Sequence, residues 1–322
     1  MTNTVNRKDW IDIAKGIGII LVVIGHTRFS TGIVGEWINS FHMPLFFILA
    51  GFCFNEHRYP NLLYYFLRKI NVLVFPYVTL SLFAISILNL FYFGSDPQFS
   101  TIVLLRKIPT GILGAFWFIP VLVQVEILFA VLMRYIDSLQ ARILLCGIIL
   151  CIANSLKGCN LPYAFDMVLL SIPFYGLGYF VKGIEETYIF KKKRFLIIGF
   201  CTFILFNVIV LLYIPLNVSY VCKQYANVGL FLLCAFAGTG AITFLSRFIE
   251  LQGFNLFHIK DILTFLGRQS IVLLATHTTF GLCRSTWELG WIGYVLEAGG
   301  LVLCLYLFSG PFKCLILNRR MS

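Results

Sequence analysis

The chain has 322 residues, of which 59% are hydrophobic and only 12% are charged, and its mean hydropathy is +0.89. Soluble domains carry about 25% charged residues, so this composition excludes a soluble globular protein. The formal net charge of +11 is explained by basic loops beside an anionic membrane leaflet, and we expect no nucleic acid partner.

Ten segments approach the length of about 20 apolar residues that a membrane-spanning helix needs. Together they predict an all-α, polytopic membrane protein with about ten transmembrane helices in one bundle, formed as a single domain over residues 1–322. A removable signal peptide is not expected, because the first segment carries Asp12 and Lys15. The segments are 11–27, 37–54, 72–93, 112–133, 143–155, 165–181, 195–214, 228–245, 262–282 and 291–317.

The distribution of basic residues predicts the orientation of the chain. Ten spans place both termini on one side of the membrane. Only six of the 25 Lys and Arg then fall on the opposite side, which leaves 19 on the side of the termini. Because basic loops stay in the cytoplasm, we expect both termini to be cytoplasmic. The six are Arg28, Arg106, Lys107, Lys157, Lys223 and Arg284.

Two ionisable residues, Lys15 and His26, lie eleven residues apart in the first apolar segment. Eleven helical steps leave the two side chains about 20° apart around the axis and roughly 16 Å apart along it. They therefore share a face without touching. Ionisable side chains are costly in hydrocarbon, so the two residues are a candidate functional site.

The predicted topology places three histidines and a tryptophan at one depth, in the outer half of the membrane. These residues are His26, His42, Trp117 and His277. About nine residues join the first two segments, so His26 and His42 can meet, and His42 can orient His26 through its second nitrogen. The alternative for a lone membrane histidine such as His277 is a packing role, with its ring bonded to a carbonyl or a serine.

Glu126 is a further costly residue, two positions after Gln124 in the middle of the fourth segment. We expect its carboxylate to face protein or a water-filled cavity, and either to pair with a cation or to stay protonated. Lys15 is a candidate partner by charge, although Asp12, one turn earlier, is an equally available partner for Lys15. The alternative for Glu126 is a structural contact between helices.

Five motifs in chain order resemble those of the acyltransferase-3 family of integral membrane proteins, and are most similar to its fucose 4-O-acetyltransferase-like branch. The first is DIAKGIGIILVVIGHT at 12–27, which contains Lys15 and His26. It is followed by FHMPLFFILAGF at 41–52, FPY at 75–77, FWFIPVLVQVE at 116–126 and SIVLLATH at 270–277.

The resemblance implies a membrane O-acyltransferase with ten helices that transfers an acetyl group from cytoplasmic acetyl-CoA to a hydroxyl of a surface polysaccharide or its lipid-linked precursor. It implies catalytic roles for Lys15 and His26. The family often has an Arg-x-x-Arg element at the start of the third helix, where this chain has Arg68 and Lys69 but lacks the second arginine. Arg68 and Lys69 would then bind the CoA phosphates, with ordinary anchoring at the inner face as the alternative.

The resemblance also implies a setting and partners. We expect the inner membrane of a bacterium, an acetyl-CoA substrate with no permanently bound cofactor, a sugar acceptor and glycan-assembly proteins as partners. A metal site is not expected, because no His or carboxylate residues occur at a ligand spacing.

Acetyl transfer to a hydroxyl needs a base, and His26 can act directly or as an acetylated nucleophile. Trp117, His42 or a backbone amide can stabilise the oxyanion, and His277, Gln124, Glu126 and Asp12 are supporting candidates. We expect the pantetheine arm of CoA to extend through a pore from Arg68 and Lys69 towards His26.

Two other functions fit the buried charges. A transporter or flippase of a glycolipid or small solute also uses intramembrane Lys, Glu and His. Within enzymes, the acceptor can be a lipid, peptidoglycan or a small metabolite.

Overall fold

The computed structural model of the chain describes residues 8–27, 30–56, 61–91, 117–214, 218–219, 225–252, 258–286 and 290–313. These residues form helices and their connections, without a β-strand among them. Within the described ranges, seven helices are long and apolar enough to cross a membrane, and two shorter apolar helices accompany them. The prediction of an all-α polytopic membrane protein is confirmed.

The ten predicted segments each correspond to a helix or a pair of helices in the structure, except that residues 92–93, 112–116 and 314–317 lie outside the described part. The helices are α1 (Asp9–Gly25), α2 (Gly32–Cys53), α3 (Leu62–Lys69), the π-helix η2 (Ile70–Val74), α4 (Phe75–Phe91), α6 (Phe118–Tyr135), α7 (Leu139–Ser155), α8 (Phe165–Phe180), α9 (Lys193–Tyr213), α10 (Val228–Glu250), α11 (Ile259–Arg268), α12 (Ser270–Thr286) and α13 (Gly290–Ser309).

The ninth predicted segment, 262–282, differs from the structure. Its first part belongs to α11, and the helix is interrupted at Gln269 before α12 begins. Ten residues are too few to span a bilayer. α11 also carries Lys260, Asp261 and Arg268 beside apolar residues, as an amphipathic helix does. The hydropathy pattern alone merges the two helices because apolar residues continue across the break.

Several helices begin at a residue whose side chain satisfies a free backbone N–H. Asn61 accepts a hydrogen bond from the backbone N–H of Tyr64 at the start of α3 (2.7 Å), and Asn227 accepts from Gly229 at the start of α10 (2.8 Å). The first N–H groups of a helix have no partner within it, so these caps stabilise the starts of both helices.

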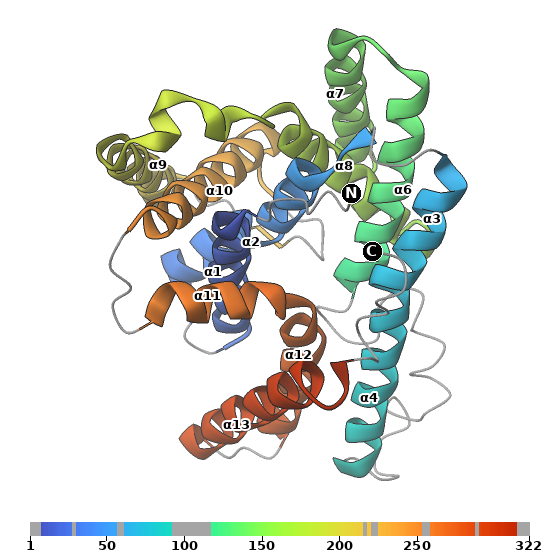
Figure 1. Cartoon of the computed structure of the whole chain (residues 1–322), viewed down its shortest axis with the longest axis vertical. Coiled ribbons are helices and arrows are strands. Elements are labelled where there is room, and N and C mark those ends of the chain that lie inside the picture. The colour runs from blue at the N-terminus through green and yellow to red at the C-terminus, as the bar shows by residue number, and fades with distance from the viewer. Residues whose placement is uncertain are drawn as a thin grey trace, which may run out of the picture. The chain divides into compact units, whose positions relative to one another are not determined.

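One compact unit, here called unit 1, consists of Met1–Phe52, Leu177–Tyr220 and Gln224–Ser270. It contains α1, α2, α9, α10 and α11. α1 packs against α11 and α10, and α10 packs against α9; Figure 1 shows α11 beside α1. Close packing depends on small residues, because a Cβ atom on Gly238 of α10 would overlap the ring of Phe41.

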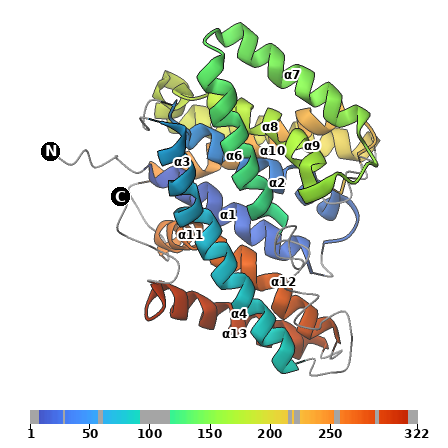
Figure 2. The same ribbon diagram turned by 90° about the vertical axis from the view of Figure 1, so that its right-hand side faces the viewer.

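The second compact unit, unit 2, consists of Cys53–Gly176, Val221–Lys223 and Ile271–Ser322. In it α3, η2 and α4 follow one another as a single long rod (Figure 2), and α6 packs against α3 and η2. The rings of Phe54, Tyr65, Phe129 and Tyr175 form an aromatic cluster with centroids 4.9–6.1 Å apart. The expectation of one domain over residues 1–322 stays a prediction.

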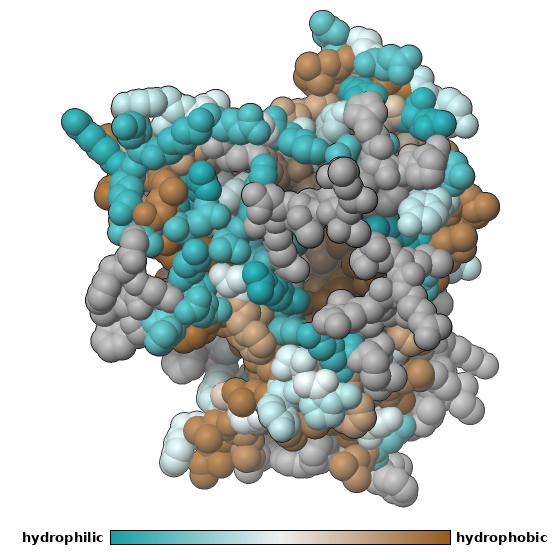
Figure 3. Space-filling model, viewed as in Figure 1, coloured by the Kyte–Doolittle hydropathy of each residue, from teal (hydrophilic) through white to brown (hydrophobic). Residues whose placement is uncertain are grey.

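The surface of the spanning helices is apolar. On α9, side chains such as Ile198 and Leu205 are exposed, and on α13 the same holds for Trp291 and Val302. Figure 3 shows hydrophobic side chains at the lower end of the view, where α13 lies. Large apolar faces of this kind are rare on soluble proteins and are expected where helices contact lipid.

Candidate functional site

α1 carries both Lys15 and His26, but it ends earlier than the predicted segment. Its last residue is Gly25, and His26 follows as the C-cap, with its backbone N–H donating to the carbonyls of Val22 and Val23. The side chain of His26 is exposed, and that of Lys15 is half-buried.

His42 lies in α2 and is 8% exposed. Its Nδ1 donates to the carbonyl oxygen of Ile38, one turn earlier, at 2.7 Å. This bond fixes the neutral ring with its proton on Nδ1, so Nε2 presents a lone pair. His42 lies near enough to His26 to be affected by the charge of that residue. The middle of α2 thus holds a second imidazole in a defined tautomer near His26.

The first turns of α1 carry two carboxylates that pair with basic residues of α11. Asp12 is buried, and its Oδ2 accepts a hydrogen bond from Nε of Arg268 at 3.1 Å. Asp9 is more exposed and pairs with Lys260 at 3.3 Å and with Arg268 at 3.7 Å. Lys15 has no ion-pair partner among the described residues.

Glu126 is 6% exposed in α6 and pairs with Lys69 of α3, whose Nζ lies 2.7 Å from its Oε2. The prediction that this carboxylate finds a cation is therefore right, but the proposed cation, Lys15, is not the partner observed. Lys69 also lies over the ring of Tyr65, at 5.2 Å from the centroid. Packing of α3 on α6 brings these residues together, and the sequence pattern does not reveal that packing.

Arg68 is half-buried in the last turn of α3, next to Lys69. The π-helix η2 begins directly afterwards at Ile70. A π-helix adds a residue to the turn and re-aims the side chains around it, and such turns are frequent at functional sites. The Arg68–Lys69 pair thus stands at an irregular turn in an otherwise continuous rod.

Three other predicted residues lie in unit 2. Trp117 is buried at the N-cap of α6. Gln124 donates from Nε2 to the carbonyls of Pro120 and Tyr163, both at 3.1 Å, so its amide joins α6 to the segment before α8. His277 is buried in α12 and its Nδ1 donates to the carbonyl of Leu273 at 2.9 Å. That bond is the one that a packing role requires.

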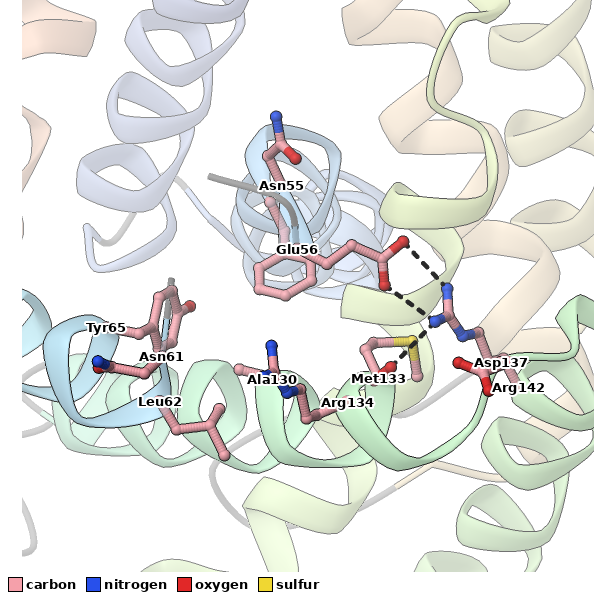
Figure 4. A pocket seen from close by; sticks show the side chains of 11 residues that line it. Asn55, Glu56, Asn61, Leu62, Tyr65, Ala130, Met133, Arg134, Asp137 and Arg142 are labelled. Carbon is pink, nitrogen blue, oxygen red and sulfur yellow. Dashed lines mark hydrogen bonds and ion pairs between the residues drawn. The ribbon is translucent and has the colours of Figure 1, made fainter. Parts of the chain in front are cut away.

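A cavity of about 480 Å³ opens in unit 2 between residues 54–56, the start of α3, the end of α6 and the start of α7 (Figure 4). Pockets for small molecules and cofactors have volumes of about 300–1,000 Å³. The lining residues are Phe54, Asn55, Glu56, Asn61, Leu62, Tyr65, Ala130, Met133, Arg134, Asp137 and Arg142.

Arg142 is the best-anchored polar residue of this cavity. It forms a two-pronged pair with Glu56, at 2.9 and 3.3 Å, and donates to the carbonyl of Met133 (Figure 4). It also donates from Nε to the carbonyl of Ile136. Two positive and two negative side chains line the cavity, together with two asparagines. Sequence reasoning missed this site because it interpreted Arg142 only as a basic anchor at the inner face.

The cavity ends close to the buried ion pair. Tyr65 lines it and lies under the ammonium group of Lys69. Ala130 also lines it, one helical turn after Glu126 on α6. Two residues of the cavity wall are thus neighbours of the buried Lys69–Glu126 pair.

The predicted residues fall into two sets. Asp12, Lys15, His26 and His42 lie in unit 1. Residues of the second set lie in unit 2: Arg68, Lys69, Trp117, Gln124, Glu126 and His277. Among the residues that the structure describes, no group of three His, Cys, Asp or Glu is arranged to hold a metal ion.

Comparison with known proteins gives one match. Residues 8–312 match the acyltransferase domain that defines the acyltransferase-3 family, which covers nearly the whole chain and all helices of both units. No curated protein and no solved structure matches the chain significantly. The chain therefore belongs to the acyltransferase-3 family and is a membrane acyltransferase.

Proposed function

We propose that the chain is an O-acetyltransferase that moves an acetyl group from cytoplasmic acetyl-CoA to a hydroxyl of a cell-surface polysaccharide or its lipid-linked precursor. The observation that carries the proposal is the pair of imidazoles in unit 1. His26 is exposed at the C-terminus of α1, and the neighbouring His42 is held in one tautomer by Ile38.

The proposed role of His42 follows from its bond to Ile38. Because Nδ1 is already a donor, Nε2 of His42 can accept a hydrogen bond from one ring nitrogen of His26. The other nitrogen of His26 then carries the lone pair and can face the acceptor. A hydrogen bond at one ring nitrogen fixes the tautomer and orientation of a functional histidine. His42 is thus a positioning residue for the base.

In the direct route, His26 removes the proton of the acceptor hydroxyl as its oxygen attacks the carbonyl carbon of the thioester. The tetrahedral intermediate collapses with cleavage of the C–S bond, and the imidazolium returns the proton to the CoA thiolate. In the alternative route, His26 attacks first, releases CoA and passes the acetyl group to the hydroxyl. Trp117 or a backbone amide is the proposed donor to the oxyanion in either route, because the Nδ1–H of His42 is already donated to Ile38.

The donor is assigned to the basic residues. Lys15 precedes His26 on α1 by three turns and would bind the donor on the inner side of the membrane. In unit 2, the charge of Lys69 is already balanced by Glu126. Arg68 therefore carries more of the proposed binding of the CoA phosphates than Lys69 does, and its guanidinium suits a phosphate well. Glu126 supports this turn by holding Lys69.

The proposed setting is the inner membrane of a bacterium with both termini in the cytoplasm, and glycan-assembly proteins would supply the acceptor. Two kinds of function compete with this proposal. One is acyl transfer to a lipid, to peptidoglycan or to a small metabolite, and the other is transport of a glycolipid.

Mass spectrometry of surface glycans tests the proposal. Glycans of a strain without the gene should lose an acetyl mass increment, the wild-type gene should restore it, and the His26→Ala gene should not. The control is His258→Asn, which removes an exposed histidine with a left-handed backbone that asparagine tolerates. Unchanged glycan acetylation in the strain without the gene would contradict the proposed acceptor.

A further inference from the structure

The crossing of α1 and α11 in unit 1 brings two backbones into direct contact. A Cβ atom on Gly16 would overlap the carbonyl of Leu263, and a Cβ atom on Gly267 would overlap the carbonyl of Asp12. Only glycine permits so close an approach at both positions. The contact lies beside Lys15, because Gly16 is the next residue. α11 therefore fixes the turn of α1 from which Lys15 projects.

Asp12 lies in the same turn, with its side chain only 4% exposed. A buried carboxylate is stable only when it is paired and hydrogen-bonded. Arg268 supplies that partner from the last turn of α11, where its side chain is 47% exposed, and it reaches Asp9 as well. The two residues are 256 positions apart in the chain, so this pair exists only in the folded protein.

Asp12 and Lys15 are neighbours on one helix, at the spacing of three residues at which opposite charges attract each other. In the structure Asp12 pairs with Arg268, and Lys15 has no ion-pair partner among the described residues. Without Arg268, Asp12 would lose this charged partner, and its carboxylate would be the acceptor three residues from the Lys15 ammonium group on α1. An ammonium captured in this way could not contact an acyl donor.

From this arrangement we infer that Arg268 is a positioning residue for acyl transfer: by holding Asp12, it keeps Lys15 available to the acyl donor. The inference rests on the proposed function, because it requires Lys15 to act on the donor. Arg268 itself touches neither substrate. The amphipathic helix α11 is too short to span the membrane. Its proposed role is to carry Arg268 to Asp12.

The test measures transfer of labelled acetyl from acetyl-CoA in isolated membranes, at equal amounts of membrane-inserted protein. We expect Arg268→Ala to lower kcat/KM for acetyl-CoA about tenfold. The double variant Asp12→Asn/Arg268→Ala should recover to within about threefold of the wild type, because the competing charge is gone. Arg268→Lys should stay active. The matched control is Lys260→Ala, which removes an exposed ion pair with Asp9 from the same helix.

Recovery of activity in the double variant distinguishes a positioning role of Arg268 from a purely structural role. If the double variant is as inactive as Arg268→Ala, or if Arg268→Ala has full activity, the inference is wrong. Should Arg268→Ala fail to reach the membrane, the same comparison uses Arg268→Gln. Loss of both proteins from the membrane would identify Arg268 as a folding residue and would also overturn the inference.

The Lys15→Ala variant distinguishes this failure from failure of the proposed function. Full activity of Lys15→Ala would refute the role of Lys15 in transfer, whatever Arg268 does. If Lys15→Ala is inactive, a second Arg268→Ala change in it should cause no further loss, because Arg268 acts through Lys15. An additional loss would overturn the inference while the role of Lys15 stands.

Discussion

Removing Lys69 should leave the buried carboxylate of Glu126 without its partner. The Nζ–Oε2 distance of 2.7 Å and an effective dielectric constant of about 20 give an attraction of roughly 6 kcal/mol. Desolvation of both groups offsets part of this attraction, and the lysine side chain is still 18% exposed. We therefore expect Lys69→Met to lower the free energy of unfolding by about 3 kcal/mol, at the lower end for a broken buried pair.

Thermal unfolding of the detergent-solubilised protein measures this loss. A change of about 3 kcal/mol corresponds to a fall in Tm on the order of 5–10 °C. The double variant Lys69→Met/Glu126→Gln should regain most of it, because no charge is then left buried. Lys191→Ala, which removes an exposed lysine, is the control. An unchanged Tm in Lys69→Met, or a double variant less stable than Lys69→Met, would refute the reasoning.

Three further changes test other parts of the structure. Gly267→Ala places a Cβ against the carbonyl of Asp12 and should destabilise the protein by about 2 kcal/mol, whereas Gly147→Ala, which meets no atom within 4 Å, should not; an equal Tm for both would contradict the close crossing. His42→Phe should lower kcat about 10–100-fold at an unchanged protein level, and normal kcat would exclude a positioning role. Arg68→Ala should raise KM for acetyl-CoA more than it lowers kcat, and an unchanged KM would remove Arg68 from the donor site.

The helices and their order could be predicted from the sequence, because long apolar segments allow little but a spanning helix. One exception is α3 (Leu62–Lys69), which precedes the predicted segment 72–93. The other is 262–282, where an amphipathic helix and a spanning helix follow each other with only Gln269 between them. Apolar residues continue across that break, so a hydropathy window cannot separate the two helices.

The ionisable residues of α1 and α2 could be identified from the sequence because each is costly in a membrane. The ion-pair partners of such residues could not be identified in this way. Glu126 pairs with Lys69 and Asp12 pairs with Arg268 because α6 packs on α3 and α11 packs on α1. Charge alone left Lys15 as an equally good partner for Glu126. Helix packing decides such pairs, and it depends on local fits such as the glycine at 267.

The cavity of unit 2 shows a second limit of sequence reasoning. Arg142 lies next to an apolar segment, where basic residues are expected as anchors for topology. Glu56 lies just after another apolar segment. Their two-pronged pair appears only when residues 54–56, the end of α6 and the start of α7 come together. A residue can therefore serve the topology and line a pocket at the same time.

The most direct test of the central claim is the initial rate of labelled acetyl transfer from acetyl-CoA in isolated membranes that contain the His26→Ala protein. We predict that this rate falls to that of membranes without the protein, while membranes with His258→Asn transfer acetyl at the wild-type rate. A wild-type rate with His26→Ala, at an equal amount of protein, would contradict the assignment of His26 as base or acyl carrier.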